Sequence, residues 1–451
     1  MKRVFSGAFL FLTAVIFISL AADLCFLSRN TAWKQGIDGW EGMPDFKVYW
    51  ACSRNFAERS VFLAGKDERR EKKGRFEYAP VYDKNEEFYH FRYSPLAALV
   101  MVPFAKIDYP AVSLLLWSLS VNIAFICALF ILTRRLSRDF GVTETRKYVI
   151  MWVTFLGTAR YYLMIIGQGQ TDAFVTLFFV LFLMAYLDGR HILCGFLIAV
   201  ILQVKLLFLP MLVYFIFRGK FRIVISGAVF FLLFLFLPSC VIGIRENIVL
   251  LGEWKDILKI SVTSQLMNFK NQSVAYGISV LLLKNGWIRG HLTPEKLIYP
   301  LSAFFTLLSY GALILYGKIS SRSRQPGYGY VEVSFLLIMC LLFAPTSWEA
   351  YYSALIIPAA FTVLLILKNP GHVFPYAAAA FYFFFSCAIG TDITKYIPGV
   401  NSARFINISL GTVFLAAAMA SAYEKYIVSL RDTVLPGVPG GNIFAKIPGR
   451  N

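Results

Sequence analysis

The chain has 451 residues, of which 58% are hydrophobic and 16% are charged, and its formal net charge is +18. Soluble domains carry roughly a quarter charged residues, so this balance excludes most soluble classes. The basic residues gather in short clusters between apolar stretches, as at Arg134–Arg138, Arg218–Arg222 and Lys318–Arg324. Such clusters are typical of short cytoplasmic loops. We therefore expect an integral membrane protein that binds no nucleic acid.

Val4–Leu27 is the first apolar stretch, and it has the length of about 20 residues that a helix needs to cross a bilayer. It is too long for the apolar region of a cleavable signal peptide. Asp23 and Leu24 also lack the small side chains that a cleavage site before Cys25 would need. Residues 1–27 are therefore predicted to form a retained signal-anchor helix that runs outward.

The basic clusters orient the rest of the chain when they are placed in the cytoplasm. Residues 28–92 then form a long extracytoplasmic loop, residues 93–424 a polytopic helical domain, and residues 425–451 a cytoplasmic tail. The spans expected within the helical domain are residues 110–133, 148–166, 172–187, 223–243, 297–317, 331–345, 351–367, 373–389 and 406–424. The prediction is an all-α membrane protein with about 10–13 transmembrane helices, in the bacterial cytoplasmic membrane.

Two apolar stretches do not fit a simple span. Leu96–Ile107 is short and bracketed by prolines, so it either spans or lies at the membrane interface. Ile192–Phe217 is long for one span and has basic residues at both ends. Ile192–Phe217 is therefore either one long span or a hairpin of two short helices that dips into the membrane and returns to the same side.

Polar segments at residues 167–172, 245–273 and 345–352 fall on the outer side together with the first loop. A polar surface that non-consecutive segments build at one membrane face indicates a functional site. The cysteines are scattered without a CxxC pair, and no HExxH motif occurs. The sequence therefore predicts no metal site, no disulfide framework and no cofactor.

Asp45 begins the aromatic segment Asp45–Trp50 of the outer loop. Partial burial among aromatic neighbours would raise the pKa of this carboxylate and suit it to general-base catalysis. The alternative is a helix N-cap, because an Asp before a helical run accepts hydrogen bonds from free backbone N–H groups. Spacing alone favours the cap.

Four other polar residues are candidates. Gln168 and Asp172 can bind sugar hydroxyls, although Thr171 or Asp172 can equally cap the following helix. Lys205 interrupts an apolar stretch, and an ionisable residue in a membrane segment is a functional candidate that suits a phosphate. Alternatively, the Lys205 side chain extends to the lipid headgroups and has no role in binding. Glu349 is the single carboxylate between Glu332 and Asp392.

Taken in chain order, these segments resemble the family 87 glycosyltransferases, polytopic enzymes of the GT-C class. The resemblance runs from Asp45 to about Pro358. It rests on the motifs Asp45–Trp50 (DFKVYW), Phe91–Leu96 (FRYSPL), Gly167-Gln168, Lys205 with Pro210, Asn271-Gln272-Ser273, and Ser347-Trp348. The chain departs from its relatives at Ala350, where many carry His, and at Thr171-Asp172, where many carry Asn.

The resemblance implies an inverting enzyme of GT-C-like fold that moves a hexose, with mannose the expected sugar. The donor would be a polyprenyl-phosphate-linked sugar, and the acceptor a glycolipid or glycan at the outer face, among the membrane lipids. Asp45 becomes the general base in place of the cap. The candidates for the donor phosphate are Lys205, Arg92 and Arg160, since a cation can stabilise the leaving phosphate. The candidates for substrate binding are Gln168, Asp172, Asn271, Glu349 and Tyr351.

Two other membrane-protein classes are alternatives. A transporter or lipid-linked-sugar flippase would place polar residues near the midplane of several helices, often within internal repeats. Here the strongly polar residues, apart from Lys205, gather at helix ends. An oligosaccharide ligase or polymerase would carry its main outer loop late in the chain, whereas the longest outer loop here comes first.

Overall fold

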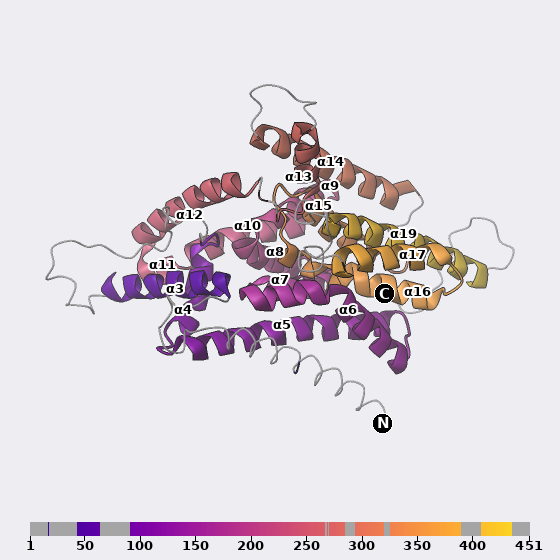
Figure 1. The fold of residues 1–451 in the computed structure, drawn as a ribbon, viewed down its shortest axis with the longest axis horizontal. Coiled ribbons are helices and arrows are strands. Elements are labelled where there is room, and N and C mark those ends of the chain that lie inside the picture. Colours follow the sequence, from indigo (N-terminus) through magenta and orange to yellow (C-terminus); the bar gives the residue numbers. More distant parts are fainter. Residues whose placement is uncertain are drawn as a thin grey trace. The chain divides into compact units, whose positions relative to one another are not determined.

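The computed structural model describes residues 17, 43–63, 91–266, 268, 270–284, 294–319, 325–388 and 407–434 (Figure 1). Within these residues every regular element is a helix, which confirms the all-α prediction. Apart from Phe17, the predicted signal anchor lies outside the described residues, as do residues 28–42 and 64–90 of the predicted outer loop and the end of the predicted tail.

The chain divides into two compact units. Unit 1 comprises Met1–Ala128, Tyr161–Ala185 and Gly189–Asn268, and unit 2 comprises Leu129–Arg160, Tyr186–Asp188 and Phe269–Asn451. Two long helices contribute residues to both units: α5 (Pro110–Asp139) and α6 (Glu144–Gln168).

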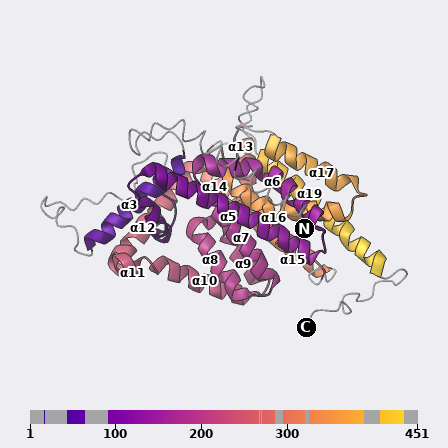
Figure 2. The same cartoon turned by 90° about the horizontal axis from the view of Figure 1, so that it is seen from below.

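Unit 1 is built around a series of mostly short helices (Figure 2). Besides parts of α5 and α6 it contains α3 (Pro44–Leu63), α4 (Pro95–Ala105), most of α7 (Asp172–Leu187), α8 (His191–Val204), α9 (Pro210–Phe217), α10 (Phe221–Phe236), α11 (Ser239–Ile242) and α12 (Ile244–Gln265). The α4 helix has 11 residues and is about 16 Å long, so it is too short to cross a hydrocarbon core of about 30 Å.

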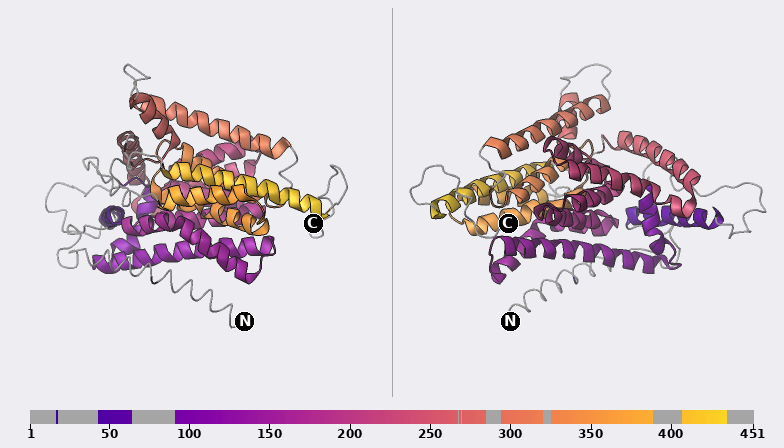
Figure 3. Two further views of the ribbon diagram at one scale, coloured as in Figure 1. Left: turned by 45° about the vertical axis from the view of Figure 1, so that its right-hand side comes forward. Right: turned by 180° about the vertical axis from the view of Figure 1, so that it is seen from behind.

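Unit 2 contains most of the C-terminal half of the chain. Its elements are α13 (Val274–Lys284), α14 (Pro294–Ile319), α15 (Tyr328–Phe343), the 3₁₀ helix η5 (Glu349–Leu355), α16 (Ile356–Lys368), α17 (Val373–Phe383), the π-helical turn η6 (Phe384–Ala388) and α19 (Asn407–Val434). The α19 helix packs along both α16 and α17, and the orange and yellow ribbons lie side by side in Figure 3.

Six helical stretches among the described residues are long and apolar enough to cross a membrane. They are Ala111–Asp139, Glu144–Gln168, Phe221–Ile242, Lys296–Lys318, Glu349–Lys368 and Asn407–Leu430. Each coincides with a predicted span. Large apolar side chains such as Leu232 and Phe304 are exposed on them, as lipid-facing residues would be. The other predicted spans, at 172–187, 331–345 and 373–389, form shorter apolar helices.

Helices α8 and α9 form the hairpin that the basic flanks predicted. The backbone leaves the helical region at Lys205 (φ −135°, ψ 88°), and Pro210 begins α9. A Cβ built on Gly227 of α10 would lie 3.7 Å from Gly195 Cα in α8 and 3.2 Å from Leu212 Cδ2 in α9. A straight helix would separate Gly195 from Leu212 by about 25 Å. The chain therefore reverses direction between α8 and α9, with Lys205 at the tip.

Candidate active site

The turn between α6 and α7 is fixed by its own backbone. Gly169 adopts the left-handed conformation (φ +69°), and its N–H donates to Ile166 O at 3.1 Å. The Gln170 N–H donates to Ile165 O at 2.9 Å. These two bonds form a Schellman motif, which ends α6 and fixes the direction in which the next residues leave the helix.

Helix α3 packs directly against this turn. A Cβ on Gly169 would lie 2.7 Å from Phe46 Cβ and 3.3 Å from Met43 Cβ, so a side chain at Gly169 would displace α3. From the other side, Trp117 Nε1 donates to Gly169 O at 2.8 Å, and its ring stacks on Phe46 with centroids 5.7 Å apart. Glycine at position 169 thus brings the start of α3 into contact with the turn.

Asp45 lies in the first turn of α3, next to Pro44. Its Oδ2 accepts a hydrogen bond of 2.5 Å from Gln170 Nε2, which also donates at 2.5 Å to Gln168 Oε1. Asp45 is therefore inside the helix and bonded to another segment, so the N-cap alternative does not describe it. Burial raises the pKa of Asp45 above its ordinary value, and the Gln170 hydrogen bond and the charges of Lys205 and Arg92 partly offset this rise.

Lys205, at the hairpin tip, forms a buried ion pair with the first residue of α7. Its Nζ lies 3.1 Å from Asp172 Oδ2, and the two side chains are 5% and 2% exposed. The same ammonium lies 5.5 Å from the ring centroid of Tyr93, within the range of a cation–π contact. Breaking such a pair by removing one partner strongly destabilises a fold, so the pair has a structural role whatever else it does.

Tyrosine hydroxyls connect the hairpin tip to α3. The hydroxyls of Tyr49 and Tyr93 are 2.6 Å apart, and Thr171 Oγ1 donates to the Tyr93 hydroxyl at 3.2 Å. Arg92, next to Tyr93, is half-buried, and its carbonyl accepts a hydrogen bond of 2.9 Å from Trp254 Nε1 of α12. Most of the predicted polar segment at 245–273 is this helix.

Unit 1 thus brings together five of the predicted site residues. Asp45 lies within electrostatic reach of Lys205, Arg92 and Asp172, and Gln168 is connected to it through Gln170. Sequence reasoning missed Gln170. The available signal was the repeated Gly-Gln pair at 167–170, which places two amides on one tight turn.

In unit 2 the structure pairs Arg160 with Glu349. Arg160 Nη2 lies 2.6 Å from Glu349 Oε1, and its Nη1 donates to Ser386 O at 3.3 Å. Glu349 is the first residue of the 3₁₀ helix η5, and Tyr351 follows in the same helix with a partly exposed side chain. The pair joins α6 to the segment that precedes α16.

Asn271 has a clear structural role in unit 2. Its Nδ2 donates to Pro345 O at 3.0 Å, and its Oδ1 accepts from the backbone N–H groups of Ser273 and Ser347, both at 3.0 Å. The side chain is buried and holds two segments together through their backbones. Its predicted contact with substrate stays a prediction.

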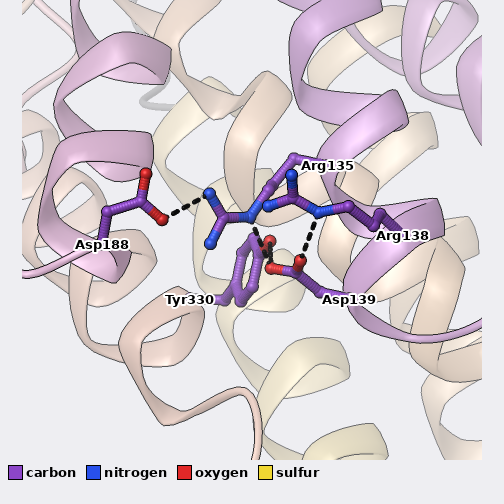
Figure 4. A network of polar contacts seen from close by, with 5 residues as sticks. All are labelled: Arg135, Arg138, Asp139, Asp188 and Tyr330. Atoms are coloured by element: carbon purple, nitrogen blue, oxygen red, sulfur yellow. Dashed lines mark hydrogen bonds and ion pairs between the residues drawn. The ribbon is translucent and has the colours of Figure 1, made fainter. Parts of the chain in front are cut away.

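A second polar cluster in unit 2, here called the arginine network, connects α5 to α15 (Figure 4). Arg135 lies 2.7 Å from Asp139 Oδ2 and 2.8 Å from Asp188 Oδ1, and Arg138 lies 3.3 Å from Asp139 Oδ1. The Tyr330 hydroxyl donates to Asp139 Oδ2 at 2.8 Å. Both carboxylates are thus in direct contact with an arginine.

Comparison with protein families matches the model of glycosyltransferase family 87 to residues 91–345, more than half of the chain. The chain belongs to glycosyltransferase family 87. It is therefore a glycosyltransferase, and its apolar helices make it an integral membrane protein. This membership confirms the predicted family and disfavours the alternative of a transporter or lipid-linked-sugar flippase.

The matched stretch of this family 87 member is shorter than the predicted resemblance from Asp45 to about Pro358. It contains the candidate cations Arg92, Arg160 and Lys205, whereas Asp45 precedes it and Glu349 follows it. No curated protein matches the chain.

Proposed function

We propose that this glycosyltransferase moves a hexose, with mannose the expected sugar, from a polyprenyl-phosphate donor to a glycolipid or glycan acceptor, with inversion at the anomeric carbon. The observation that carries the proposal is the surroundings of Asp45 in unit 1. A partly accessible carboxylate is held by a neutral amide, with two cations, Lys205 and Arg92, in electrostatic reach. Asp45 would then be the base, and the two cations would stabilise the phosphate that leaves as an anion.

In the proposed reaction an acceptor hydroxyl oxygen attacks the anomeric carbon as Asp45 takes its proton. The bond from the anomeric carbon to the phosphate oxygen breaks, and its electron pair leaves with the polyprenyl phosphate. Attack from the face opposite the leaving group inverts the anomeric configuration. The raised pKa of Asp45 supports this role, because a stronger base accepts the proton more readily.

The leaving phosphate gains negative charge as the bond breaks, and a positioned cation stabilises that charge without a metal. Lys205 is the first candidate, because its ammonium carries three N–H donors and can contact a phosphate oxygen while Asp172 holds it. Asp172 would then keep Lys205 charged and in place. Arg92 is the second candidate, since its influence also reaches Asp45.

The remaining candidates are proposed on their placement. Gln168 shares the turn with Gln170 and could bind a sugar hydroxyl near Asp45. Arg160 is the third candidate for the donor phosphate, and Glu349 and Tyr351, with Asn271, are candidates for the sugar or the acceptor. Arg160 and Glu349 hold each other in place through their ion pair.

The proposed orientation places this chemistry outside the cytoplasm of a bacterial cell. Unit 1 carries Asp45, Gln168 and Lys205 at the N-terminal end of α7, and the basic residues Arg218 and Arg222 flank the base of the hairpin. Basic residues favour the cytoplasmic side. Cysteine labelling in intact cells should therefore modify a cysteine introduced at Asp108 from outside and one at Arg222 only after permeabilisation.

The donor assay tests the function itself. The purified full chain in lipid nanodiscs would receive polyprenyl-phosphate mannose, polyprenyl-phosphate glucose or a nucleotide-linked mannose, together with a total lipid or glycan extract as acceptor. We expect consumption of a polyprenyl-phosphate sugar and a product of inverted anomeric configuration. Consumption of the nucleotide-linked sugar alone, or a product of retained configuration, would contradict the proposal.

A further inference from the structure

We propose that Gln170 is a positioning residue for Asp45: its amide holds one carboxylate oxygen and directs the other toward the acceptor hydroxyl. This inference rests on the proposed role of Asp45 as general base. It assigns a function to a residue that is not among the motifs carrying the family resemblance.

The backbone of Gln170 is fixed by hydrogen bonds and contacts of the turn, independently of its side chain. Its N–H completes the Schellman motif with Ile165 O, and the preceding Gly169 is in contact with Phe46 of α3 and bonded to Trp117. The side chain is only 8% exposed. An amide on so constrained a turn has few alternative positions, so its bond to Asp45 fixes the carboxylate relative to α6 and α7.

The donor and acceptor chemistry determines what Gln170 can do. Its Nε2 carries two N–H donors, and the two contacts at 2.5 Å, to Asp45 Oδ2 and Gln168 Oε1, use one each. A donor facing Asp45 favours the ionised carboxylate, which is the form that can accept a proton. Among the described residues Oδ1 of Asp45 makes no hydrogen bond, so it is the oxygen available to the acceptor.

A neutral amide suits this position better than an arginine or a lysine. A direct ion pair would lower the proton affinity of Asp45 and make it a weaker base. Among the described residues Asp45 has no ion pair within 4 Å, whereas Asp172, two residues beyond Gln170, pairs with Lys205 at 3.1 Å. Gln170 therefore orients the carboxylate while leaving it basic.

The test is the pH dependence of kcat/KM in the purified full chain, with Gln170→Met as the variant. Methionine keeps the length and loses both donors, so the acid limb of the profile should move upward by about one to two pH units. Activity should recover at high pH. The matched control is Thr171→Val. Thr171 lies on the same turn as Gln170, and the substitution removes its buried hydrogen bond to the Tyr93 hydroxyl. The acid limb of this control should stay at the wild-type position.

A second variant keeps the test decisive if Gln170→Met does not fold. Gln170→Glu places a carboxylate against Asp45, and the repulsion should move the acid limb upward further than methionine does. An unmoved acid limb in the folded variants would overturn the positioning role. Asp45→Asn distinguishes a failure of the Gln170 proposal from a failure of the proposed function. If Asp45→Asn turns over at the wild-type rate, Asp45 is not the general base. If Asp45→Asn is inactive but the acid limb of Gln170→Met is unmoved, only the positioning role of Gln170 is contradicted.

Discussion

The arginine network of unit 2 and the surroundings of Asp45 in unit 1 both place charges among apolar helices, but they use them differently. In the arginine network both carboxylates, Asp139 and Asp188, lie within 2.8 Å of an arginine nitrogen. In unit 1 Asp172 has such a partner in Lys205, while Asp45 is held by an amide. A carboxylate that contacts an arginine or a lysine directly has an oxygen occupied by that cation, whereas Asp45 is contacted by a neutral donor. We infer that the first cluster maintains the fold and that Asp45 is kept available for chemistry.

The largest expected effect is that of Asp45→Asn. Asparagine can still accept the Gln170 hydrogen bond but cannot take a proton, so turnover should fall by about 10²–10⁴-fold with little change in thermal stability or donor binding. Asp108→Asn makes the same charge change at an exposed position and should leave turnover unchanged. If Asp45→Asn turned over at nearly the wild-type rate, Asp45 would have no catalytic role that distinguishes it from the carboxylates of the arginine network.

Gly169→Ala tests the contact that positions Asp45. The added Cβ would lie 2.7 Å from Phe46 Cβ, so α3 must shift, and a displacement of about 1 Å at a reacting group can reduce turnover by about 10²-fold. Gly189→Ala is the matched control, because Gly189 has φ +70° but no atom within 4 Å of its added Cβ. Both variants should lose about 1 kcal/mol or more of stability from backbone strain, but only Gly169→Ala should lose activity. Equal turnover in the two variants would count against the contact.

Removing Lys205 should affect stability and donor affinity separately. Lys205→Met alone leaves Asp172 buried without its partner, and such a loss costs about 3–5 kcal/mol. The double variant Lys205→Met, Asp172→Asn removes both charges and should regain most of that stability. Its apparent KM for the donor should still rise tenfold or more, as expected for a lost charge-assisted contact.

The single variant Asp172→Asn shows how much of that change belongs to Asp172, because it retains the ammonium. Donor KM values measured in nanodiscs for the three variants check the assignment. If the double variant has the wild-type KM, Lys205 serves only the fold.

The smallest effect on activity is expected in the arginine network. Tyr330→Phe removes the hydroxyl that donates to Asp139 at 2.8 Å and should reduce the free energy of unfolding by about 1 kcal/mol, with kcat and KM unchanged. Tyr376→Phe is the control, because Tyr376 is exposed. Thermal unfolding in detergent and the transfer assay together measure both quantities. A loss of turnover in Tyr330→Phe would show that the arginine network also takes part in function.

The sequence predicted the positions of the long apolar helices well, because an apolar stretch of about 20 residues forms a helix when it is buried in lipid. The span expected at 110–133 is helix α5, and the one at 297–317 is α14. The hairpin at 192–217 was also predicted from its basic flanks. Helix α12, which makes up most of the polar segment 245–273, was not predicted, since it lacks a long apolar stretch.

The candidate site was predicted only in part. The residues Asp45, Lys205 and Asp172 were candidates from the sequence, but the pairing of Lys205 with Asp172 and the role of Gln170 as the partner of Asp45 were not predicted. The pairing of Lys205 with Asp172 joins the C-terminal end of α8 to the first residue of α7, and the sequence does not give the distance between these two ends. Gln170 required the packing of α3 on Gly169, a contact between segments about 120 residues apart.

The most direct test of the central claim is the pH profile of kcat/KM for the wild type beside that of Asp45→Asn. Asp45 must be ionised to accept a proton, so wild-type activity should fall as the pH drops through the pKa of this group. Because burial raises that pKa, the midpoint should lie above the ordinary value of an aspartate. The residual activity of Asp45→Asn should lack this acid limb. The same limb at the same midpoint in both proteins would show that another group is the base and would contradict the account.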